Sequence, residues 1–323
     1  MCTAIWYQSG ERYFGRTLDY ELSYGEQVVI TPRRFPLAFR MLPPLERHYA
    51  ILGTAAVQEG YPLYFDAANE MGLAAAGLLF AGYAAYPAPE EGKENVSPFE
   101  LIPWLLGQCA DLAAARALLE RINLAALPFS EELPLSPLHW LIADRNRAIT
   151  LEVTREGMKI YENQVGVLTN SPPFPHHLLR LADHCGLSAQ GAVNRLAPRL
   201  ELPAYSRGMG GIGLPGDASS CSRFVRAAFL KENAADAGNE PERVGQFFHV
   251  LGGVEQVKGA VRLETGDAHT LYTACYNLDR SVYYYSTYQN RQISSVSLGH
   301  EPLEGDRLIC YPMICEQQIH AVN

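Results

Sequence analysis

The chain has 323 residues, 48% of them apolar and 19% charged, a composition typical of a soluble globular protein with a substantial buried core. Its net charge of −9 argues against a nucleic-acid partner, which would require a basic face. No basic leader precedes an apolar segment, and no apolar run reaches the ~18 residues that span a bilayer. We therefore expect a cytoplasmic protein with no membrane partner.

The first predicted elements are strands. Residues 3–8 (TAIWYQ) and 12–20 (RYFGRTLDY) flank Ser9-Gly10 and predict a β-hairpin, because β-branched and aromatic residues dominate both arms. Further strands are predicted over residues 27–32, 50–57 and 73–80. The last of these lies in the run MGLAAAGLLFAGYAAY, whose Gly and Ala content and following proline favour a buried strand over a membrane helix.

Helices are predicted for the middle of the chain, and strands return near its end. Apolar residues at helical spacing predict helices within residues 98–109, 110–122, 219–233 and 241–253. Residues 270–278 and 281–289 flank Asp279-Arg280 and predict a second hairpin, followed by a strand over 292–298. This order predicts one α+β domain over residues 1–323, with antiparallel sheets and helices on their outer faces. A division into two domains is the alternative.

Common cofactor and metal motifs do not fit the chain. Gly208, Gly210 and Gly213 match the dinucleotide pattern GxGxxG, but loop sequence surrounds them on both sides, so a glycine loop is expected. The seven cysteines are odd in number and form no CxxC pair, which favours reduced thiols over disulfides or zinc. The nine histidines show no metal-like spacing. We expect no metal and no cofactor.

Cys2 directly follows the initiator methionine. Methionine aminopeptidase removes Met1 when the second side chain is small, and cysteine qualifies. Cys2 would then carry a thiol and a free α-amino group on one residue. The thiolate is a nucleophile, and an α-amino group with an ordinary pKa of about 8 suits a general base. Position 2 can therefore supply both groups; an accidental terminal cysteine is the alternative.

Arg16 and Asp19 lie on the second arm of the predicted hairpin. Pairing around Ser9-Gly10 joins residues whose numbers add to about 19 to 21, which sets Cys2 opposite positions 17–19. An aspartate there can hold the terminal ammonium, and an arginine can lower the pKa of the thiol. Residues three apart point to opposite faces of a regular strand, so a bulge or strand end is needed to bring both to Cys2. A surface ion pair is the alternative.

Blocks along the whole chain resemble the choloylglycine hydrolase family, which groups bile salt hydrolases with penicillin V acylases. In order, they are MCTAIWYQSGERYFGRTLDYELSYGEQVVITPR, YPLYFDAANEMGL, ELPLSPLHWLIAD, GVLTNSPPFPHHL, GLPGDASSCSRFVRAAF and TLYTACYNLDRSVYYYSTYQNRQI. The resemblance implies an N-terminal nucleophile (Ntn) hydrolase fold, an αββα sandwich of two antiparallel sheets between helical layers. It also implies a homo-oligomer, a tetramer in this family.

The resemblance further implies the catalytic residues. Cys2 matches the family's nucleophile, and Arg16 and Asp19 match the R-x-x-D pair beside it. Asn170 in LTNSP matches an asparagine that donates to the oxyanion, and Arg223 in SRFVR matches an arginine near the nucleophile. An amide carbonyl under attack develops a negative oxygen that requires such N–H donors, and arginines favour a thiolate or an anionic substrate. A turn asparagine and a helix-surface arginine are the alternatives.

Leu79 departs from the family pattern. The block AAAGLLF resembles one that usually reads Gly-Leu-Asn-Phe in bile salt hydrolases and usually carries a tyrosine in penicillin V acylases. Loss of an essential side-chain donor would lower the rate by about 10²–10³-fold. The backbone N–H of Leu79 can still donate to the oxyanion, so we expect activity with an open substrate preference.

The resemblance implies hydrolysis of glycine or taurine amides of cholate-type acids, with a small-molecule amide as substrate. Penicillin V acylase activity is one alternative, and a binding protein that has lost turnover is another, which only Leu79 favours. An apolar pocket would suit the acyl group. Its candidate lining residues, which could equally be ordinary core, are Tyr20, Leu22, Tyr24, Tyr61, Phe65 and Phe129.

Overall fold

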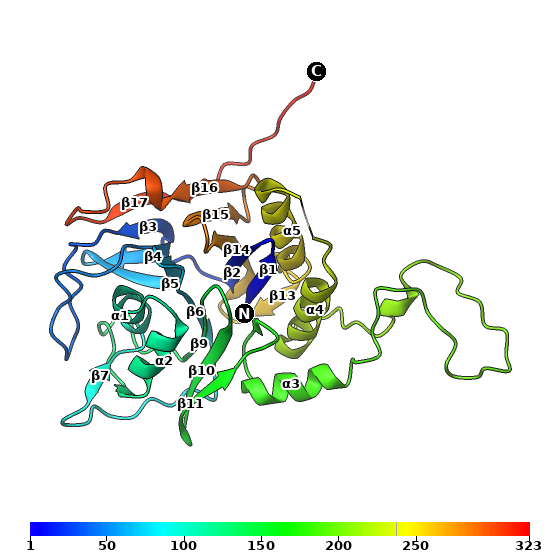
Figure 1. Cartoon of the computed structure of the whole chain (residues 1–323), viewed down its shortest axis with the longest axis horizontal. Coiled ribbons are helices and arrows are strands. Elements are labelled where there is room, and N and C mark those ends of the chain that lie inside the picture. Colours follow the sequence, from blue (N-terminus) through cyan, green and yellow to red (C-terminus); the bar gives the residue numbers. More distant parts are fainter. Residues whose placement is uncertain (237) are drawn as a thin grey trace.

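The structure is a computed structural model that describes residues 1–236 and 238–323. Strands dominate both ends of the chain (Figure 1). The helices are α1 (Leu101–Gln108), α2 (Leu112–Leu119), α3 (Phe174–Ala182), α4 (Ser220–Asn233) and α5 (Glu240–Gly252). The strands are β1 (Cys2–Ser9), β2 (Glu11–Tyr20), β3 (Gln27–Thr31), β4 (Ile51–Gln58), β5 (Tyr61–Asn69), β6 (Ala74–Leu79), β7 (Glu94–Val96), β8 (Ile122–Leu124), β9 (Leu138–Ala143), β10 (Ala148–Thr154), β11 (Gly157–Glu162), β12 (Val167–Leu168), β13 (Val261–Leu263), β14 (Gly266–Asn277), β15 (Val282–Thr287), β16 (Ser294–Ser297) and β17 (Ile309–Pro312).

Two large antiparallel sheets form the centre of the molecule. A seven-stranded sheet has the order β12-β1-β2-β14-β15-β16, with β13 paired to β14. An eight-stranded sheet has the order β11-β10-β9-β6-β5-β4-β3-β17. The two hairpins predicted from the sequence, β1–β2 and β14–β15, are neighbours in the first sheet, because β2 pairs with β14. Segments from the two ends of the chain therefore build one sheet.

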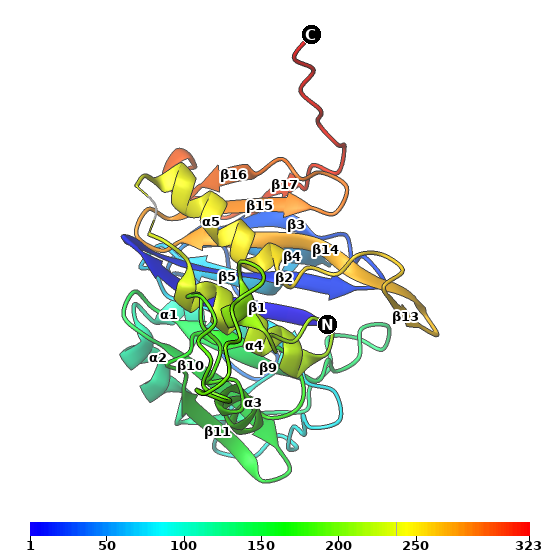
Figure 2. The same ribbon diagram turned by 90° about the vertical axis from the view of Figure 1, so that its right-hand side faces the viewer.

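Helices cover the outer face of each sheet, which gives four layers (Figures 1 and 2). Helices α1 and α2 pack on the eight-stranded sheet through a core that includes Trp104, Leu119 and Trp140. Helices α4 and α5 pack on the seven-stranded sheet, where Phe224 and Phe247 join the larger core. The expectation of an α+β fold with an αββα sandwich is confirmed. Among the described helices, none is long and apolar enough to cross a bilayer.

The sequence patterns located four of the five described helices and the strands at both ends. They did not predict α3, nor the strands β5, β7 to β13 and β17. Strand β9 is buried on both faces, and its sequence LHWLIA shows no regular alternation between apolar and polar residues. The sequence AITLEVT of β10 does alternate, so β10 carried a strand signal that the predictions left out. The GxGxxG stretch lies in the connection between α3 and α4, where residues Met209–Gly211 form a 3₁₀ turn, in agreement with the expected loop.

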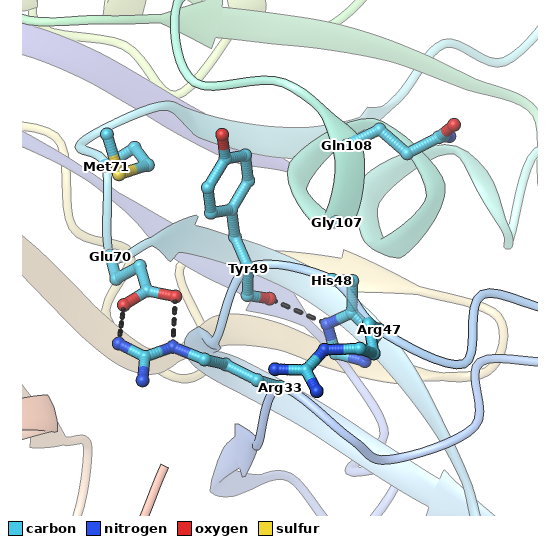
Figure 3. A pocket seen from close by; sticks show the side chains of 8 residues that line it. All are labelled: Arg33, Arg47, His48, Tyr49, Glu70, Met71, Gly107 and Gln108. Atoms are coloured by element: carbon cyan, nitrogen blue, oxygen red, sulfur yellow. Dashed lines mark hydrogen bonds and ion pairs between the residues drawn. The ribbon is translucent and has the colours of Figure 1, made fainter. Parts of the chain in front are cut away.

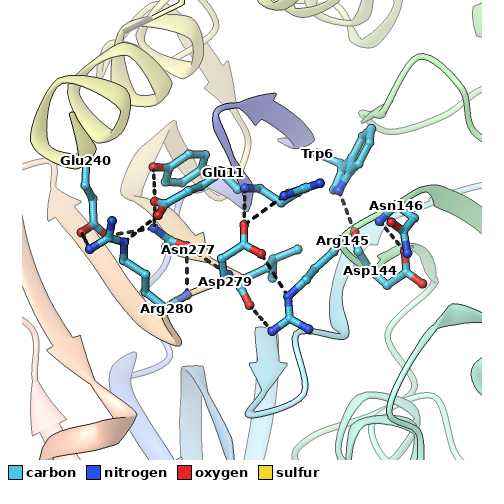
Figure 4. Close-up of polar contacts among 12 residues, drawn as sticks. Trp6, Glu11, Asp144, Arg145, Asn146, Glu240, Asn277, Asp279 and Arg280 are labelled. Carbon is cyan, nitrogen blue, oxygen red and sulfur yellow. Dashed lines mark hydrogen bonds and ion pairs between the residues drawn. The ribbon is translucent and has the colours of Figure 1, made fainter. Parts of the chain in front are cut away.

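A polar network holds the turn end of the β1–β2 hairpin against its surroundings (Figure 4). Arg280, in the β14–β15 turn, contacts Glu11 at 2.8 Å and Glu240 at the start of α5 at 3.2 Å. The neighbouring Asp279 pairs at 3.1 Å with Arg145 from the β9–β10 turn. The network thus joins both sheets and α5 at the end of the hairpin that lies away from Cys2.

The connection between α3 and α4 extends far from the body of the molecule (Figure 1). We call residues 183–219 the arm. Large apolar side chains of the arm are exposed, namely Val193, Leu196, Leu200, Leu202, Tyr205 and Ile212.

Candidate active site

The β1–β2 hairpin places Cys2 inside the molecule. Gly10, at φ +59°, forms the tip of the turn, and Cys2 pairs with Leu18 as the sequence register predicted. Opposed residues in an antiparallel pair point to the same face, so Cys2, Leu18 and Arg16 share one face of the sheet. That face lies against the eight-stranded sheet, because Arg16 bonds to residues of β5 and β6. The Cys2 side chain is therefore buried between the two sheets.

Arg16 is fully buried and is bound mainly by backbone carbonyls. Its Nη1 donates to the carbonyl oxygens of Phe65 at 3.1 Å and Gly77 at 2.6 Å. Phe65 is the extra residue at a bulge in β5, and the pairing of β6 with β5 stops at Ala76, so both acceptors lie at irregular points of the sheet. Burial alone would lower the pKa of Arg16, but attraction to Cys2 and other nearby acidic groups raises it. The guanidinium stays charged beside the thiol.

Asp19 lies on the opposite face of β2. Its carboxylate accepts hydrogen bonds from the hydroxyls of Thr17 at 3.1 Å and Thr270 at 2.6 Å. Burial raises the pKa of this carboxyl, and the charge of Arg223 opposes the rise. The backbone of Asp19 pairs with Met1 in both directions: its carbonyl accepts from the Met1 amine at 2.5 Å, and its N–H donates to the Met1 carbonyl at 2.8 Å.

Arg16 and Asp19 therefore reach the N-terminus without sharing a face. The sequence suggested that a bulge or a strand end must bring both to Cys2. The structure has a register shift in β14 opposite this point, between Thr270 and Tyr272, but the side chains still point to opposite faces. Arg16 lies on the side of the Cys2 thiol, whereas Asp19 lies beside the main chain of residues 1 and 2.

Asn170 connects Cys2 to the remaining predicted residues. Its Oδ1 accepts from the backbone nitrogen of Cys2 and from Nη2 of Arg223, each at 2.7 Å. Its Nδ2 donates to the carbonyl of Leu79 at 2.8 Å. Two donors facing one side of the amide and an acceptor facing the other fix which atom is the oxygen. The side chain is thus held in one orientation, with Leu79 in contact through its backbone.

Arg223 projects from α4 and is fully buried. Its Nη1 donates to the carbonyl of Cys2 and to the Thr3 hydroxyl, and its Nη2 donates to Asn170. Burial lowers the pKa of Arg223, while Asp19 and Cys2 favour its charged form. The five residues matched by resemblance therefore meet around the start of β1, from β2, α4 and the segment after β12.

The six candidate pocket residues fall into two groups. Tyr20 stacks on Tyr24 at 5.6 Å between ring centroids, and Tyr24 packs on Phe65, whose carbonyl holds Arg16. Leu22 lies exposed in the same loop as Tyr24. Tyr61 and Phe129 instead pack on Phe99, before α1. The first group borders the Arg16 site directly, and the lining role of all six remains a prediction.

A pocket of about 680 Å³ lies elsewhere (Figure 3). It is lined by Arg33, Arg47, His48, Tyr49, Glu70, Met71, Gly107 and Gln108, none of them a predicted site residue. Arg33 forms a two-point ion pair with Glu70, and its third nitrogen contacts Glu304 at 2.7 Å. Arg47, which also lines the pocket, lies 3.7 Å from Glu304, so each charged side chain of the lining has an ion-pair partner. Across residues 1–236 and 238–323, no cluster of three His, Cys, Asp or Glu side chains could hold a metal.

Several residues of the site carry no signal in the sequence. Thr17 and Thr270 hold the carboxylate of Asp19, and Ser220 accepts from the backbone N–H of Asn170 at 2.9 Å. Thr17 lies within the predicted hairpin, two residues before Asp19, but Thr270 and Ser220 come from distant parts of the chain, so no local spacing could have linked those two to position 2.

A buried thiol at the start of a strand, with Arg16 on its side of the sheet, Asn170 bound to its backbone nitrogen and Arg223 bound to its carbonyl, fits a hydrolase with an N-terminal nucleophile. The family of linear amide C–N hydrolases, choloylglycine hydrolase family, matches residues 2–311. The chain belongs to this family.

Relatives and solved structures agree with this assignment. The chain is 53% identical over its full length to a bile salt hydrolase/transferase of Lactiplantibacillus plantarum, and all of that relative is covered. A solved structure of conjugated bile acid hydrolase from Clostridium perfringens matches with a TM-score of 0.92 and 33% identity over 100% of both chains. Penicillin V acylase from Agrobacterium tumefaciens shares the fold, with a TM-score of 0.75 and 19% identity over 96% of this chain and 90% of that one.

Proposed function

We propose that the protein hydrolyses the amide bond that joins a cholate-type bile acid to glycine or taurine. The observation that carries the proposal is the Cys2 backbone nitrogen, held by Asn170 at 2.7 Å beside two buried arginines. Removal of Met1 turns this nitrogen into the α-amino group of the nucleophile. The relatives named above, whose names specify bile salts or conjugated bile acids, support the choice of substrate.

The proposed reaction has two stages. The Cys2 thiolate attacks the amide carbonyl carbon, and the C–N bond then breaks to leave a thioester and a free amine. The α-amino group of Cys2 supplies the proton that the departing amine takes. Water next attacks the thioester, which releases the bile acid and returns the thiol with the proton balance restored. No metal or cofactor takes part.

Asn170 and the backbone N–H of Leu79 stabilise the oxyanion in this proposal. The Nδ2 of Asn170 carries two hydrogens, and one bonds to the Leu79 carbonyl. The second hydrogen is the donor assigned to the substrate oxygen. Arg16 and Arg223 place positive charge beside Cys2.

A parallel assay of glycocholate, taurocholate and penicillin V, followed by mass spectrometry, tests the proposal. Release of cholate that is faster than release of phenoxyacetate, and that disappears in Cys2→Ala, is expected. The intact mass first confirms that Met1 is absent. Faster cleavage of penicillin V would assign the protein to the acylases. A protein that binds bile salts without cleaving any of the three would be the degenerate binding protein.

We also propose that the chain forms a homo-oligomer, a tetramer by family resemblance, through the arm. The exposed apolar side chains of the arm support this, because such side chains on a projecting segment gain from burial against another copy. Light scattering of the wild type and of Leu196→Asp tests it, and a monomeric wild type would refute it. We further propose a reducing, cytoplasmic location, which the exposed free thiols of Cys185, Cys310 and Cys315 support.

A further inference from the structure

Three buried titratable side chains contact the backbone of Asn170 or of its neighbour Thr169, directly or through one another. The proposed reaction uses none of them. They are His139 on β9, Glu152 on β10 and His177 on α3, each at most 1% exposed. The ring of His139 stacks on Phe80 at 4.3 Å, and that of His177 stacks on Phe224 at 4.9 Å. Packing on both rings leaves each imidazole little freedom to turn.

The two histidines bind consecutive backbone carbonyls. The Nε2 of His139 lies 3.0 Å from the carbonyl oxygen of Thr169, and the Nε2 of His177 lies 2.8 Å from that of Asn170. A carbonyl only accepts, so both Nε2 atoms must carry a hydrogen. Burial lowers the pKa of His177 to about 4, so its ring is neutral near neutral pH, with the hydrogen on Nε2.

Glu152 fixes the first histidine and the start of α3. Its Oε1 lies 3.1 Å from Nδ1 of His139 and accepts from the backbone N–H of Phe174 at 2.9 Å. His139 already donates through Nε2, so the contact at Nδ1 requires one more proton between the ring and the carboxyl group. Whichever of the two groups holds that proton, the pair has no net charge. It therefore orients the Thr169 carbonyl without adding charge near Cys2.

Asn170 needs such support because strand pairing does not reach it. Strand β12 ends at Leu168, the last residue there that pairs with β1. Beyond that point, the backbone of Asn170 is held by Ser220 at its N–H and by His177 at its carbonyl. The Asn170 side chain in turn holds the nitrogen of Cys2.

Two atoms of the cluster remain buried without a hydrogen-bond partner among the described residues, namely Oε2 of Glu152 and Nδ1 of His177. Unpaired buried polar atoms destabilise a fold, and apolar side chains of similar size would avoid them. Stability alone therefore does not explain why polar side chains occupy these three positions. We propose that His139, Glu152 and His177 are positioning residues, which set Asn170 and, through it, the α-amino group of Cys2 for the proposed hydrolysis.

A pair of variants at one position tests the inference. His177→Leu keeps the volume and removes the donor, whereas His177→Gln places a side-chain N–H near the position of Nε2. We expect kcat of H177L to fall by about tenfold, as for the loss of one buried hydrogen bond, with KM changed by less than about threefold. H177Q should recover most of the lost rate. Glu152→Gln, which preserves shape, should also lower kcat, because one amide atom at the Oε1 position cannot serve both partners of the carboxylate. An NH2 group there would bond to Nδ1 of His139 and leave the N–H of Phe174 unpaired, whereas an oxygen there would make a neutral His139 give up one of its two bonds.

His48→Gln is the matched control. His48 is also buried and also contacts two backbone carbonyls, those of Phe35 and Tyr49, but it lies at the separate cavity of Figure 3. We expect H48Q to leave kcat unchanged per folded molecule. Equal kcat in H177L, H177Q and wild type, or an equal fall in H48Q, would reduce the cluster to a structural role.

The rate of Cys2 alkylation by iodoacetamide gives a readout that needs no substrate. It should fall in H177L and recover in H177Q. If the wild type cleaves no bile salt while this alkylation pattern holds, the proposed function fails and the positioning role stands. If bile salts are cleaved but neither kcat nor alkylation distinguishes H177L from H177Q, the positioning role alone fails.

Discussion

The contacts of Arg223 illustrate how much at this site depends on the shape of a single side chain. Its guanidinium donates at once to the Cys2 carbonyl, the Thr3 hydroxyl and Asn170. The three acceptors lie in different directions, which suits the planar fork of an arginine. An ammonium group is a single point of charge and cannot reproduce this arrangement. Charge alone therefore does not describe what position 223 contributes.

Arg223→Lys should lower kcat for glycocholate by about 10²-fold, comparable to the loss of one preorganised donor at an oxyanion. Steady-state kinetics, normalised to folded protein by circular dichroism, measure the effect. Arg226→Lys, three residues further along α4, is the control, because Arg226 bonds only to backbone carbonyls remote from Cys2 in the contacts described. Similar losses in both variants would show that the effect comes from α4 and not from the site.

Leu79 should be tolerated because its contact with Asn170 runs through a backbone carbonyl, which any residue supplies. In Leu79→Asn, we expect cleavage of glycocholate to remain within about tenfold of wild type, since no existing donor is removed. The ratio of kcat/KM for glycocholate over penicillin V should rise, following the family pattern at this position. A variant without any turnover would contradict this account of Leu79.

At the scale of elements, the site depends on places where the strands are irregular. The carbonyl of Phe65 is available to Arg16 at a bulge, and that of Gly77 lies just beyond the last β5–β6 pair. Periodicity in a sequence predicts the regular part of a strand and is silent about such points. This explains why the hairpin register of Cys2 could be predicted from residues 2–20, while the partners of Arg16 could not.

Gly15 lies where β2 of the first hairpin is closely spaced against β14 of the second, and a substitution there tests how much space the two strands allow. A Cβ added at Gly15 would lie 1.9 Å from the carbonyl oxygen of Ala274 on β14, so the backbones of β2 and β14 would have to separate. Gly15→Ala should lower the free energy of unfolding by about 1–3 kcal/mol or more. Urea titration measures the change.

Gly245→Ala gives the opposite expectation in the same experiment. Gly245 lies within α5, and a Cβ there meets nothing within 4 Å. Because alanine favours the helix, stability should rise by about 0.5–1 kcal/mol. A Gly15→Ala protein as stable as wild type would mean that the sheet tolerates a wider spacing at the centre of the seven-stranded sheet.

At the scale of the whole molecule, the sequence predicted the identity of the candidate catalytic residues better than their arrangement in space. Resemblance to a family supplied Asn170 and Arg223, because their motifs are distinctive. Their distances from Cys2 result from packing α4 and the end of β12 against β1. Thr270 and Ser220 were missed for the same reason: a hydroxyl becomes a partner only when a distant element is brought beside it.

Stability should depend on pH through His177. Burial lowers the pKa of His177 from 6.5 to about 4, so between these values the unfolded chain binds a proton that the folded chain does not. The contribution of His177 to the free energy of unfolding is thus fully present above pH 6.5 and is lost as the pH falls toward 4. At pH 5, this loss amounts to about 2 kcal/mol. Asp19 and Asp66, whose pKa burial raises, act in the opposite direction.

Urea titrations at pH 7 and pH 5 isolate this contribution. The decrease in the free energy of unfolding from pH 7 to pH 5 should be smaller in His177→Gln than in the wild type. The two decreases should differ by roughly the same 2 kcal/mol. Identical losses would mean that the pKa of His177 is the same in the folded protein as in the unfolded chain.

The pairing of Met1 with Asp19 imposes an order on the maturation of the chain. Met1 is the last rung of the β1–β2 ladder, bonded to Asp19 through both its amine and its carbonyl. An aminopeptidase must draw the terminal residue into its own cleft, which a residue held in a sheet resists. We therefore expect the proposed removal of Met1 to precede closure of the hairpin. Protein refolded with Met1 in place should remain inactive even after treatment with aminopeptidase, because the folded hairpin keeps Met1 out of reach of that enzyme.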